Sequence, residues 1–172
     1  MIESVLSDCV KIKTPAKINL GLYITDKRPD GYHELCSIFL PVELYDVIDL
    51  KIDPVSDTLK INTSGPFAAD CPTDESNIVF KVYNKITSLL KEEKIKRRVK
   101  TESGLDLHIE KNIPAQAGLG GGSSNAAGFL KALNLLWGLN MSNYELKTLV
   151  SEIGADVPFF IECKPALVKG IG

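Results

Sequence analysis

Four glycines occupy positions 118, 120, 121 and 122, and an amphipathic helical pattern begins directly after them. Glycine loses more backbone freedom on folding than any other residue, so such a cluster indicates a sharp turn or a close approach to a ligand. Consecutive N–H groups in a glycine-rich turn can point to one place, where the start of a helix adds unpaired N–H groups and partial positive charge. The segment therefore predicts a phosphate site at the start of a helix near Ser123.

Two common phosphate-binding motifs do not fit this segment. A Walker A loop has Gly-Lys followed by Ser or Thr after its glycines, and the dinucleotide fingerprint has glycine where this chain has Ser123. A flexible strand-to-helix turn is the alternative interpretation. Ser123 and Ser124 can cap the helix, hydrogen-bond a phosphate, or bind a metal ion that bridges phosphates.

Alternating apolar residues predict the strands. In the range 17–24, Ile18 and Leu20 share one face of a half-buried strand, while Lys17 and Asn19 share the other. A short strand that Pro15 ends should precede it over 10–14. The remaining expected strands cover 48–52, 59–62 and 105–109, with two short final strands over 157–161 and 166–169.

A spacing of 3.6 residues between apolar side chains predicts three helices. The first covers 79–90, the second begins near 123 and runs to 137, and the third begins at 142. Strands and helices do not alternate strictly, so an α+β fold is expected. The expected end residues are Ser76 or Asn77 at the first N-cap, Gly138 after the second helix, the capping box of Ser142 and Glu145 at the third, and Gly154 after it.

The composition is that of an ordinary globular protein of 172 residues, large enough for one core without disulfides. The net charge of −2 lacks the basic surplus typical of proteins that bind nucleic acid. The longest strongly apolar run, 157–161, is far shorter than the about 20 residues that cross a bilayer. The first residues show no secretory pattern. We therefore expect a cytoplasmic protein with neither a nucleic-acid nor a membrane partner.

Charged and metal-binding residue types add little to this picture. The range 91–100 has six cations and two acids, which predicts a solvated helix end, with an anion-binding patch as the alternative. The cysteines, at 9, 36, 71 and 163, lack Cys-x-x-Cys spacing, so free thiols are expected. Only His33 and His108 are histidines, and no protein metal site is predicted. His108 is expected to be a solvated strand residue.

Two further residues carry groups that chemistry can use. Asp156 lies in Gly154-Ala-Asp-Val-Pro158, between a glycine that ends a helix and an apolar run, although it could simply cap a turn. Lys17 shares the polar face of its strand with Asn19 and, taken alone, would be solvated. Phosphoryl transfer needs a phosphate cradle, a cation and a group that orients the acceptor hydroxyl, and the chain offers one candidate for each.

The motif Pro114-x-x-x-Gly118-Leu119-Gly120-x-x-Ser123-Ser124 resembles the ATP loop of the GHMP kinase superfamily. More narrowly, the chain resembles the family of 4-diphosphocytidyl-2-C-methyl-D-erythritol kinases, from Lys11 to the last residue. The resemblance implies a ribosomal-protein S5 domain 2-like fold and an ATP-dependent small-molecule kinase. The further motifs that carry it are Pro15-Ala-Lys-Ile-Asn-Leu20, Arg28-Pro-Asp-Gly-Tyr-His33, the triple glycine with Ser-Ser-Asn-Ala-Ala127, and Gly154-Ala-Asp-Val-Pro158.

Carried over by position, the resemblance implies that Asp156 is the catalytic base and Lys17 its partner. It implies that Asn19, Tyr32 and His33 bind the cytidine part of the substrate, His33 through its ring nitrogens and Tyr32 by stacking. A plain Asp-Gly hairpin turn before Tyr32 is the alternative and does not exclude this role. The implied cofactor is ATP with Mg²⁺. The implied ATP loop consists of Pro114, Ala115, Gln116, Ala117, Gly118, Leu119, Gly120, Gly121, Gly122, Ser123 and Ser124.

Members of that family are considerably longer and continue into a second α/β domain that closes the substrate cleft. The resemblance therefore implies that residues 1–172 form the amino-terminal ATP-binding domain, with the second domain missing after Gly172. It implies phosphorylation of the 2-hydroxyl of 4-diphosphocytidyl-2-C-methyl-D-erythritol in the non-mevalonate isoprenoid pathway, with the fragment alone inactive. The alternatives are another small-molecule GHMP kinase and a non-catalytic nucleotide- or RNA-binding module of the same fold. The sequence leaves the oligomeric state open.

Overall fold

The computed structural model describes residues 2–6, 8–27, 33–96 and 103–170. Its strands are β1 (Ile2–Val5), β2 (Cys9–Lys27), β3 (His33–Asp53), β4 (Leu59–Ser64), β5 (Gly104–Glu110) and β6 (Ala166–Gly170). Its helices are α1 (Ile78–Lys91), α2 (Gly121–Leu136), α3 (Asn143–Val150) and α4 (Val157–Glu162), with a short 3₁₀ helix over Ala68–Asp70.

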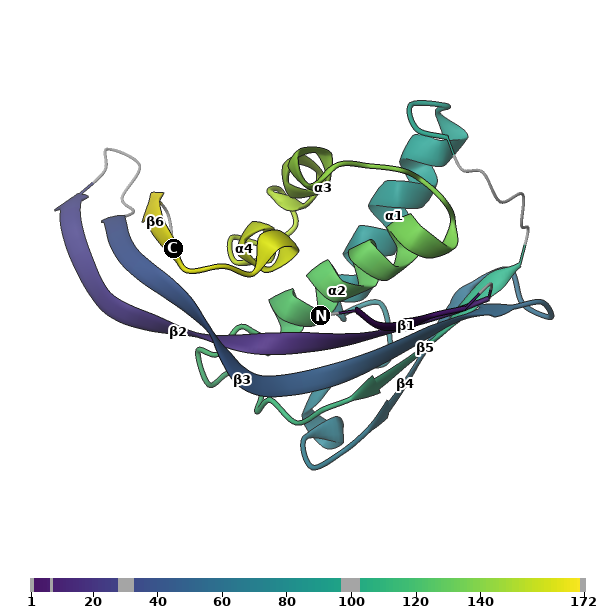
Figure 1. The fold of residues 1–172 in the computed structure, drawn as a ribbon, viewed down its shortest axis with the longest axis horizontal. Helices are drawn as coiled ribbons and strands as arrows, with labels where there is room; N and C mark the ends of the chain where they lie inside the picture. The colour runs from purple at the N-terminus through teal and green to yellow at the C-terminus, as the bar shows by residue number, and fades with distance from the viewer. Residues whose placement is uncertain (1, 7, 28–32, 97–102, 171–172) are drawn as a thin grey trace.

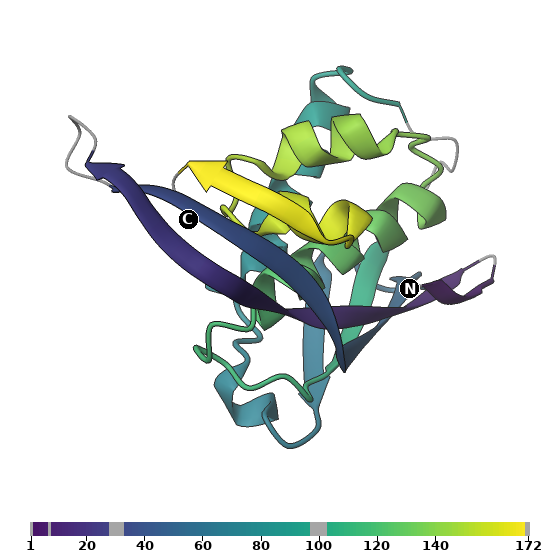
Figure 2. The ribbon, with the colours of Figure 1, turned by 60° about the vertical axis from the view of Figure 1, so that its left-hand side comes forward.

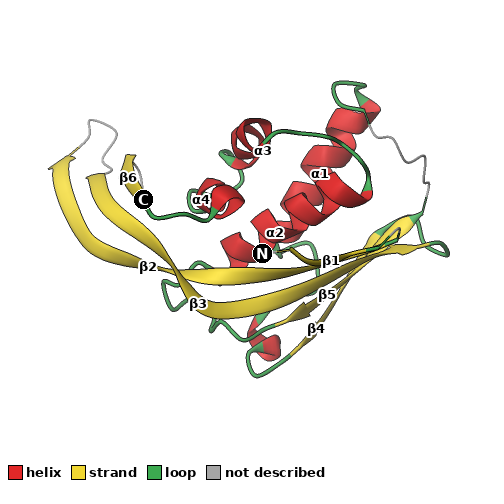
Figure 3. Cartoon of the chain, in the orientation of Figure 1, coloured by secondary structure: helices red, strands yellow, loops and turns green. Residues whose placement is uncertain are grey.

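The described strands form one six-stranded sheet in the order β1-β2-β3-β5-β4, and β6 pairs with β3. β2 and β3 form a long antiparallel hairpin, while β4 and β5 are parallel and are separated in sequence by α1. The α-helices lie on one side of the sheet (Figures 1 and 3). β6 runs beside the far part of the hairpin, which extends beyond the helices (Figure 2). This arrangement confirms the expected α+β class.

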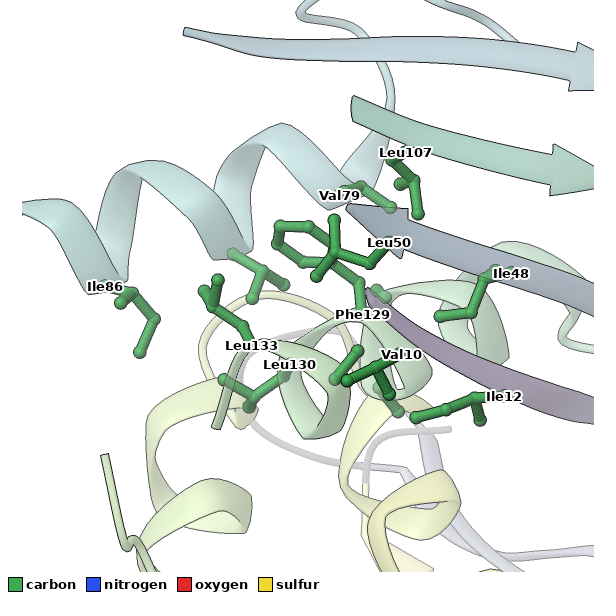
Figure 4. Close-up of a cluster of buried hydrophobic side chains, with 14 of the residues drawn as sticks. Val10, Ile12, Ile48, Leu50, Val79, Ile86, Leu107, Phe129, Leu130 and Leu133 are labelled. Atoms are coloured by element: carbon green, nitrogen blue, oxygen red, sulfur yellow. The ribbon is translucent and has the colours of Figure 1, made fainter. Parts of the chain in front are cut away.

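The core lies between the sheet and the first two helices. Phe129 and Leu133 of α2 and Val79 of α1 are fully buried and meet Leu50 and Leu107 of the sheet (Figure 4). These side chains recur at i, i+3 and i+4 in the helices and at every second residue in the strands, as the apolar spacing predicts. The core therefore fixes the start of α2 over the middle of the sheet.

The helix ends follow the expected local chemistry. The Asn77 side chain, rather than that of Ser76, accepts from the N–H of Val79 and caps α1. Gly138 has a φ of 59° after α2, and Ser142 and Glu145 form a reciprocal capping box at α3. Two boundaries differ. α2 begins at Gly121, slightly before the expected start, and α3 ends at Val150, with turns rather than helix up to Gly154.

The expected strand over 157–161 is wrong, because these residues begin α4. Val157, Phe160 and Ile161 are buried, and their spacing of three and four residues is that of one helix face. Pro158 is compatible with this helix because it lies in the first turn, where its missing N–H is not needed. An apolar run of five residues is too short for the spacing of its residues to distinguish a helix from a strand.

The expected strand break at Pro15 is also wrong. β2 continues through it, with a shift in its register against β3 between Pro15 and Ala16. β1 pairs with β2 only as far as Ile12, so beyond it the other side of β2 is an edge. A proline is tolerated at such an edge and at a bulge because no ladder hydrogen bond needs its N–H. β3 likewise begins at His33, well before the strand expected over 48–52.

Beyond the register shift at Pro15, the burial of β2 side chains departs from that of an ordinary half-buried strand, in which apolar residues are buried and polar residues are exposed. Lys17 is only 5% exposed, whereas Ile18 and Leu20 are 40% and 57% exposed. Lys17 is therefore turned into the protein while these two apolar side chains face solvent, although Asn19 on the same side of the strand as Lys17 is exposed. Lys17 is not the solvated lysine that its strand pattern alone suggests.

Candidate phosphate-binding and catalytic site

The glycine-rich segment forms a turn in which two residues adopt a backbone conformation that glycine favours. Gly118 and Gly120 have φ values of 72° and 70°, in the left-handed region that favours glycine. A Cβ on Gly120 would lie 2.9 Å from the Phe160 ring and 3.2 Å from Lys17 Cγ. A Cβ on Gly118 would meet nothing within 4 Å. The turn is therefore tightly packed at Gly120 and open at Gly118.

α2 begins at this turn without a side-chain cap. Gly120 is its N-cap residue, and its position makes no side-chain hydrogen bond to the first turn. The first-turn N–H groups of a helix have no partner within the helix and carry the positive end of its dipole. The start of α2 is therefore a place where an anion can be held by main-chain N–H groups.

A pocket of about 420 Å³ lies over this turn. The range 114–123 lines it without interruption, together with Lys111 and Asn125. The facing wall comes from the 3₁₀ helix and the start of α1, namely Asp70, Cys71, Pro72, Ser76, Asn77 and Ile78. The volume suits a small ligand such as a nucleotide.

Ser123 and Ser124 lie in different surroundings. Ser123 lines the pocket, but Ser124 does not, and it is 2% exposed. The Ser124 hydroxyl is buried with no hydrogen-bond partner among the described residues. Of the predicted ATP loop, the structure therefore places Pro114 to Ser123 around one pocket and Ser124 outside its lining.

Lys17 connects three parts of the site. Its main-chain N–H donates to the carbonyl of Leu119, at 2.9 Å, and so joins β2 to the glycine turn. Its side-chain amine lies 3.5 Å from Asp156 Oδ2. The same amine donates to Asn19 Oδ1 at 2.6 Å and lies 4.4 Å from the centre of the Phe39 ring. The amine is thus held from several directions, which a solvated lysine is not.

Asp156 occupies the N-cap position of α4, and its side chain is 25% exposed. It makes no capping hydrogen bond to that helix, so the turn-capping role is not observed. Phe159 of α4 packs edge-on against Phe39 of β3, which fixes α4 against the strand beside Lys17. The carboxylate is therefore near a cation and still open to an incoming group.

The predicted cytidine-binding residues are only partly visible. Asn19 is exposed and holds the Lys17 amine through its side-chain oxygen. Tyr32 lies outside the described residues, and of His33 only the backbone, which begins β3, is described. His108 is exposed and shares a hydrogen bond with Ser64, so its expected solvated position is confirmed.

The cysteines are all free, as predicted. Cys71 lines the pocket, and burial raises the pKa of its thiol. Among the described residues, no group of three or more His, Cys, Asp or Glu side chains is arranged to hold a metal ion. Nor is any described helix long and apolar enough to cross a membrane.

A buried ion pair between Asp46 and Lys111, which the sequence motifs do not predict, lies beneath the loop. Both residues are in phase with buried strand positions: Asp46 with Ile48 and Leu50, and Lys111 with Leu107 and Ile109. A charged residue at an apolar phase is the signal that could have revealed the pair. Phe39, which supports Lys17, carried no comparable signal.

Comparison with known proteins identifies the family of this chain. The family model of the GHMP kinases N terminal domain matches residues 77–164. The 4-diphosphocytidyl-2-C-methyl-D-erythritol kinase of Clostridioides difficile is 42% identical over 165 residues, which cover 96% of this chain and 51% of that protein. The kinase of the same name from Persephonella marina is 47% identical over 161 residues, covering 94% and 53%.

Solved structures give the same result. A crystal structure of 4-(cytidine 5'-diphospho)-2C-methyl-D-erythritol kinase superposes with a TM-score of 0.71 at 35% identity, covering 94% of this chain and 52% of that one. The phosphomevalonate kinase of Streptococcus pneumoniae, with a TM-score of 0.65 at 17% identity, shares the fold. The chain spans about half the length of the curated relatives that it matches. With its fold, its glycine loop and the family match in agreement, the chain belongs to the GHMP kinases and carries their N-terminal domain.

Proposed function

We propose that this chain is the ATP-binding domain of a kinase that phosphorylates the 2-hydroxyl of 4-diphosphocytidyl-2-C-methyl-D-erythritol. The observation that carries the proposal is the position of Lys17, which contacts the glycine turn through its backbone and Asp156 through its side chain. A phosphate cradle, a cation and a carboxylate then meet within one site, as phosphoryl transfer to an alcohol requires. The names of the relatives that the chain matches supply the substrate.

In this proposal the ATP phosphates lie against the turn from Gly118 to Ser123, where the first N–H groups of α2 face the negative charge. The base and ribose lie along the wall formed by Cys71, Asn77 and Ile78. Mg²⁺ accompanies ATP and is bound chiefly by phosphate oxygens, with few protein ligands. The Ser123 hydroxyl, a hard oxygen donor at the pocket, is the residue that we assign to it.

Asp156 accepts the proton of the acceptor hydroxyl. The hydroxyl oxygen then forms its bond to the γ-phosphorus, while the bond to the bridging oxygen breaks and ADP leaves with the electron pair. The Lys17 amine holds the carboxylate toward the acceptor and offsets negative charge at the transferring group. Asn19 and Phe39 fix that amine, so that it needs no rearrangement during the reaction.

We assign the cytidine part of the acceptor to Asn19, Tyr32 and His33. Asn19 lies in β2, His33 begins β3, and Tyr32 directly precedes His33 in the sequence, so this part of the long hairpin would form the acceptor site. The pathway that the names imply is non-mevalonate isoprenoid synthesis. The expected partners are small molecules only, in the cytoplasm.

We also propose that residues 1–172 form one ATP-binding domain, and that this domain alone does not catalyse phosphoryl transfer. The relatives are about twice as long as the matched region, and phosphoryl transfer depends on positioning and on exclusion of water. A second domain would supply the far wall of the cleft. Without it, the acceptor would be held on one side only.

The test is ADP release by the product of the complete reading frame, measured with and without the cytidine acceptor and compared with the 172-residue chain. We expect acceptor-dependent ADP release from the former and none from the latter. Equal ADP release without the acceptor, or with mevalonate in its place, would contradict the proposed substrate. Turnover by the 172-residue chain at an ordinary kinase rate of about 1–100 s⁻¹ would contradict the need for a second domain.

A further inference from the structure

An almost completely buried ion pair lies beneath the glycine turn. Lys111, the residue directly after β5, donates from its side-chain amine to Asp46 Oδ2 on β3. Their side chains are 5% and 0% exposed. Buried ion pairs are often no more stabilising than apolar side chains of the same volume, so stability alone does not account for a pair at this position.

The second oxygen of the same carboxylate binds the chain that leads into the turn. Asp46 Oδ1 accepts from the main-chain N–H groups of Asn112, at 2.7 Å, and Ile113, at 2.8 Å. Pro114, the next residue, is the first of the uninterrupted run that lines the pocket. One carboxylate thus binds three consecutive residues immediately before the proposed phosphate loop.

The far end of the loop is linked through Thr14 to the main-chain carbonyl of the same residue, and it begins close to the Lys111 amine. The Thr14 hydroxyl lies 3.2 Å from the Asp46 carbonyl oxygen and 2.8 Å from Asn125 Oδ1, in the early part of α2. The Lys111 amine would lie 3.3 Å from a Cβ on Gly121, the first residue of α2. Both ends of the glycine turn therefore converge on Asp46.

We propose that Asp46 is a positioning residue for nucleotide binding: its carboxylate holds the segment that leads into the glycine turn and its carbonyl, through Thr14, holds the start of α2, so that the phosphate site is formed before ATP arrives. Its side chain is sealed from the pocket and acts only through Lys111, Asn112 and Ile113. A turn rich in glycine is costly to order, and anchoring its ends reduces the part of that cost that falls on binding. The inference rests on the proposed function, because it takes ATP as the ligand of the turn.

The test uses Asp46→Asn and Asp46→Ala in the product of the complete reading frame, with Asp49→Asn as the matched control. Asp49 lies on the same strand but contacts Cys9 and Lys51 instead of the loop. Two properties are measured: amide hydrogen exchange over 112–124 without nucleotide, and the KM for ATP and for the acceptor together with kcat. Circular dichroism verifies the fold of each variant.

We expect folded Asp46 variants to exchange faster over 112–124 and to show a KM for ATP raised by about 10- to 100-fold. The kcat at saturating ATP and the KM for the acceptor should stay nearly unchanged, which general loss of structure would not allow. The control should behave as the wild type. A folded Asp46→Asn protein with wild-type exchange and wild-type KM for ATP would overturn the proposal.

If the single variants do not fold, the double variant Asp46→Asn with Lys111→Met removes the charge left without its partner. A folded double variant with fast exchange over 112–124 supports the proposal. A folded double variant with wild-type exchange, or one that is still unfolded, overturns it in favour of a purely structural pair. If the wild type itself fails to bind ATP, the proposed function has failed, and the exchange measurement alone decides the role of Asp46.

Discussion

The amine of Lys17 lies 3.5 Å from the carboxylate of Asp156, although the two residues are 139 positions apart in the sequence. The same lysine donates its main-chain N–H to Leu119 in the glycine turn. Movement of α4, which carries Asp156 at its N-cap, would therefore change the distance between the carboxylate and the phosphate site. Lys17 therefore links the proposed base to the proposed phosphate cradle.

The first prediction concerns this pair. In the product of the complete reading frame, Asp156→Asn and Lys17→Ala should each lower kcat by about 10²- to 10⁴-fold while ATP affinity changes little. The reason is that both residues are assigned to the acceptor hydroxyl and to the charge that develops during transfer, and not to the initial binding of ATP. Steady-state ADP release and ATP titration calorimetry give the two quantities.

A matched control is the exposed ion pair of Lys85 and Glu152, at 3.1 Å, which joins α1 to the turn after α3. Lys85→Ala and Glu152→Gln should leave kcat unchanged. Near-normal turnover by Asp156→Asn would remove Asp156 from the role of base.

The second prediction concerns the turn. Gly120→Val would require a branched side chain at a φ of 70° and would place its Cβ 2.9 Å from the Phe160 ring. We expect ATP binding to be lost in calorimetry while circular dichroism shows normal helix content.

The control for strain alone is Gly138→Ala, which puts a side chain at a φ of 59° after the opposite end of α2. It should lower stability modestly and leave ATP binding intact. If Gly120→Val titrates with ATP like the wild type, the phosphates bind elsewhere.

Local chemistry explains which parts of the fold the sequence predicts. The Asn77 cap, the Ser142 capping box and the glycine after α2 depend on neighbours within a few residues, and all three are observed. The run 157–161 is too short for its period to be measured, so its pattern predicts a strand although the residues form α4. Periodicity alone could not distinguish the two.

The site was predicted by motif and completed by tertiary contacts. Nothing in the sequence around Lys17 shows its burial, because Asp156, Phe39 and Leu119 are distant in the chain. The outward-facing Ile18 reverses the usual polarity of a strand for the same reason. The glycine turn itself was predictable, since its φ values and its helix start follow from consecutive residues.

The third prediction tests the acceptor site. His33→Ala should raise the KM for the cytidine acceptor and leave ATP affinity nearly intact, because the imidazole is assigned to the cytosine edge. His108→Ala is the matched control, since His108 is exposed on β5 and is hydrogen-bonded to Ser64. Equal losses for both ligands in His33→Ala would indicate a folding role for the hairpin.

The fourth prediction uses Cys71 as a reporter of the pocket. Burial raises the pKa of this thiol, so less of the reactive thiolate is present at any given pH than at an ordinary cysteine. Alkylation by iodoacetamide should therefore be slow near neutral pH and should accelerate as the pH rises past the ordinary thiol range. Mass spectrometry of the labelled peptide measures the rate.

Bound ATP should slow the alkylation of Cys71 further, because the thiol lines the nucleotide pocket. Cys163 is the internal control: burial raises the pKa of its thiol too, but it does not line that pocket. Protection of both cysteines by ATP would indicate a general tightening of the protein. Protection of neither would place ATP outside this pocket.

The most direct test of the phosphoryl-transfer site follows the phosphate itself. The product of the complete reading frame is given ATP labelled at the γ-phosphate together with 4-diphosphocytidyl-2-C-methyl-D-erythritol, and the position of the label is determined by NMR. The proposal predicts label on the 2-hydroxyl of the acceptor with the wild type, and almost none with Asp156→Asn. Label on another hydroxyl, label released as inorganic phosphate, or equal transfer by both proteins would contradict it.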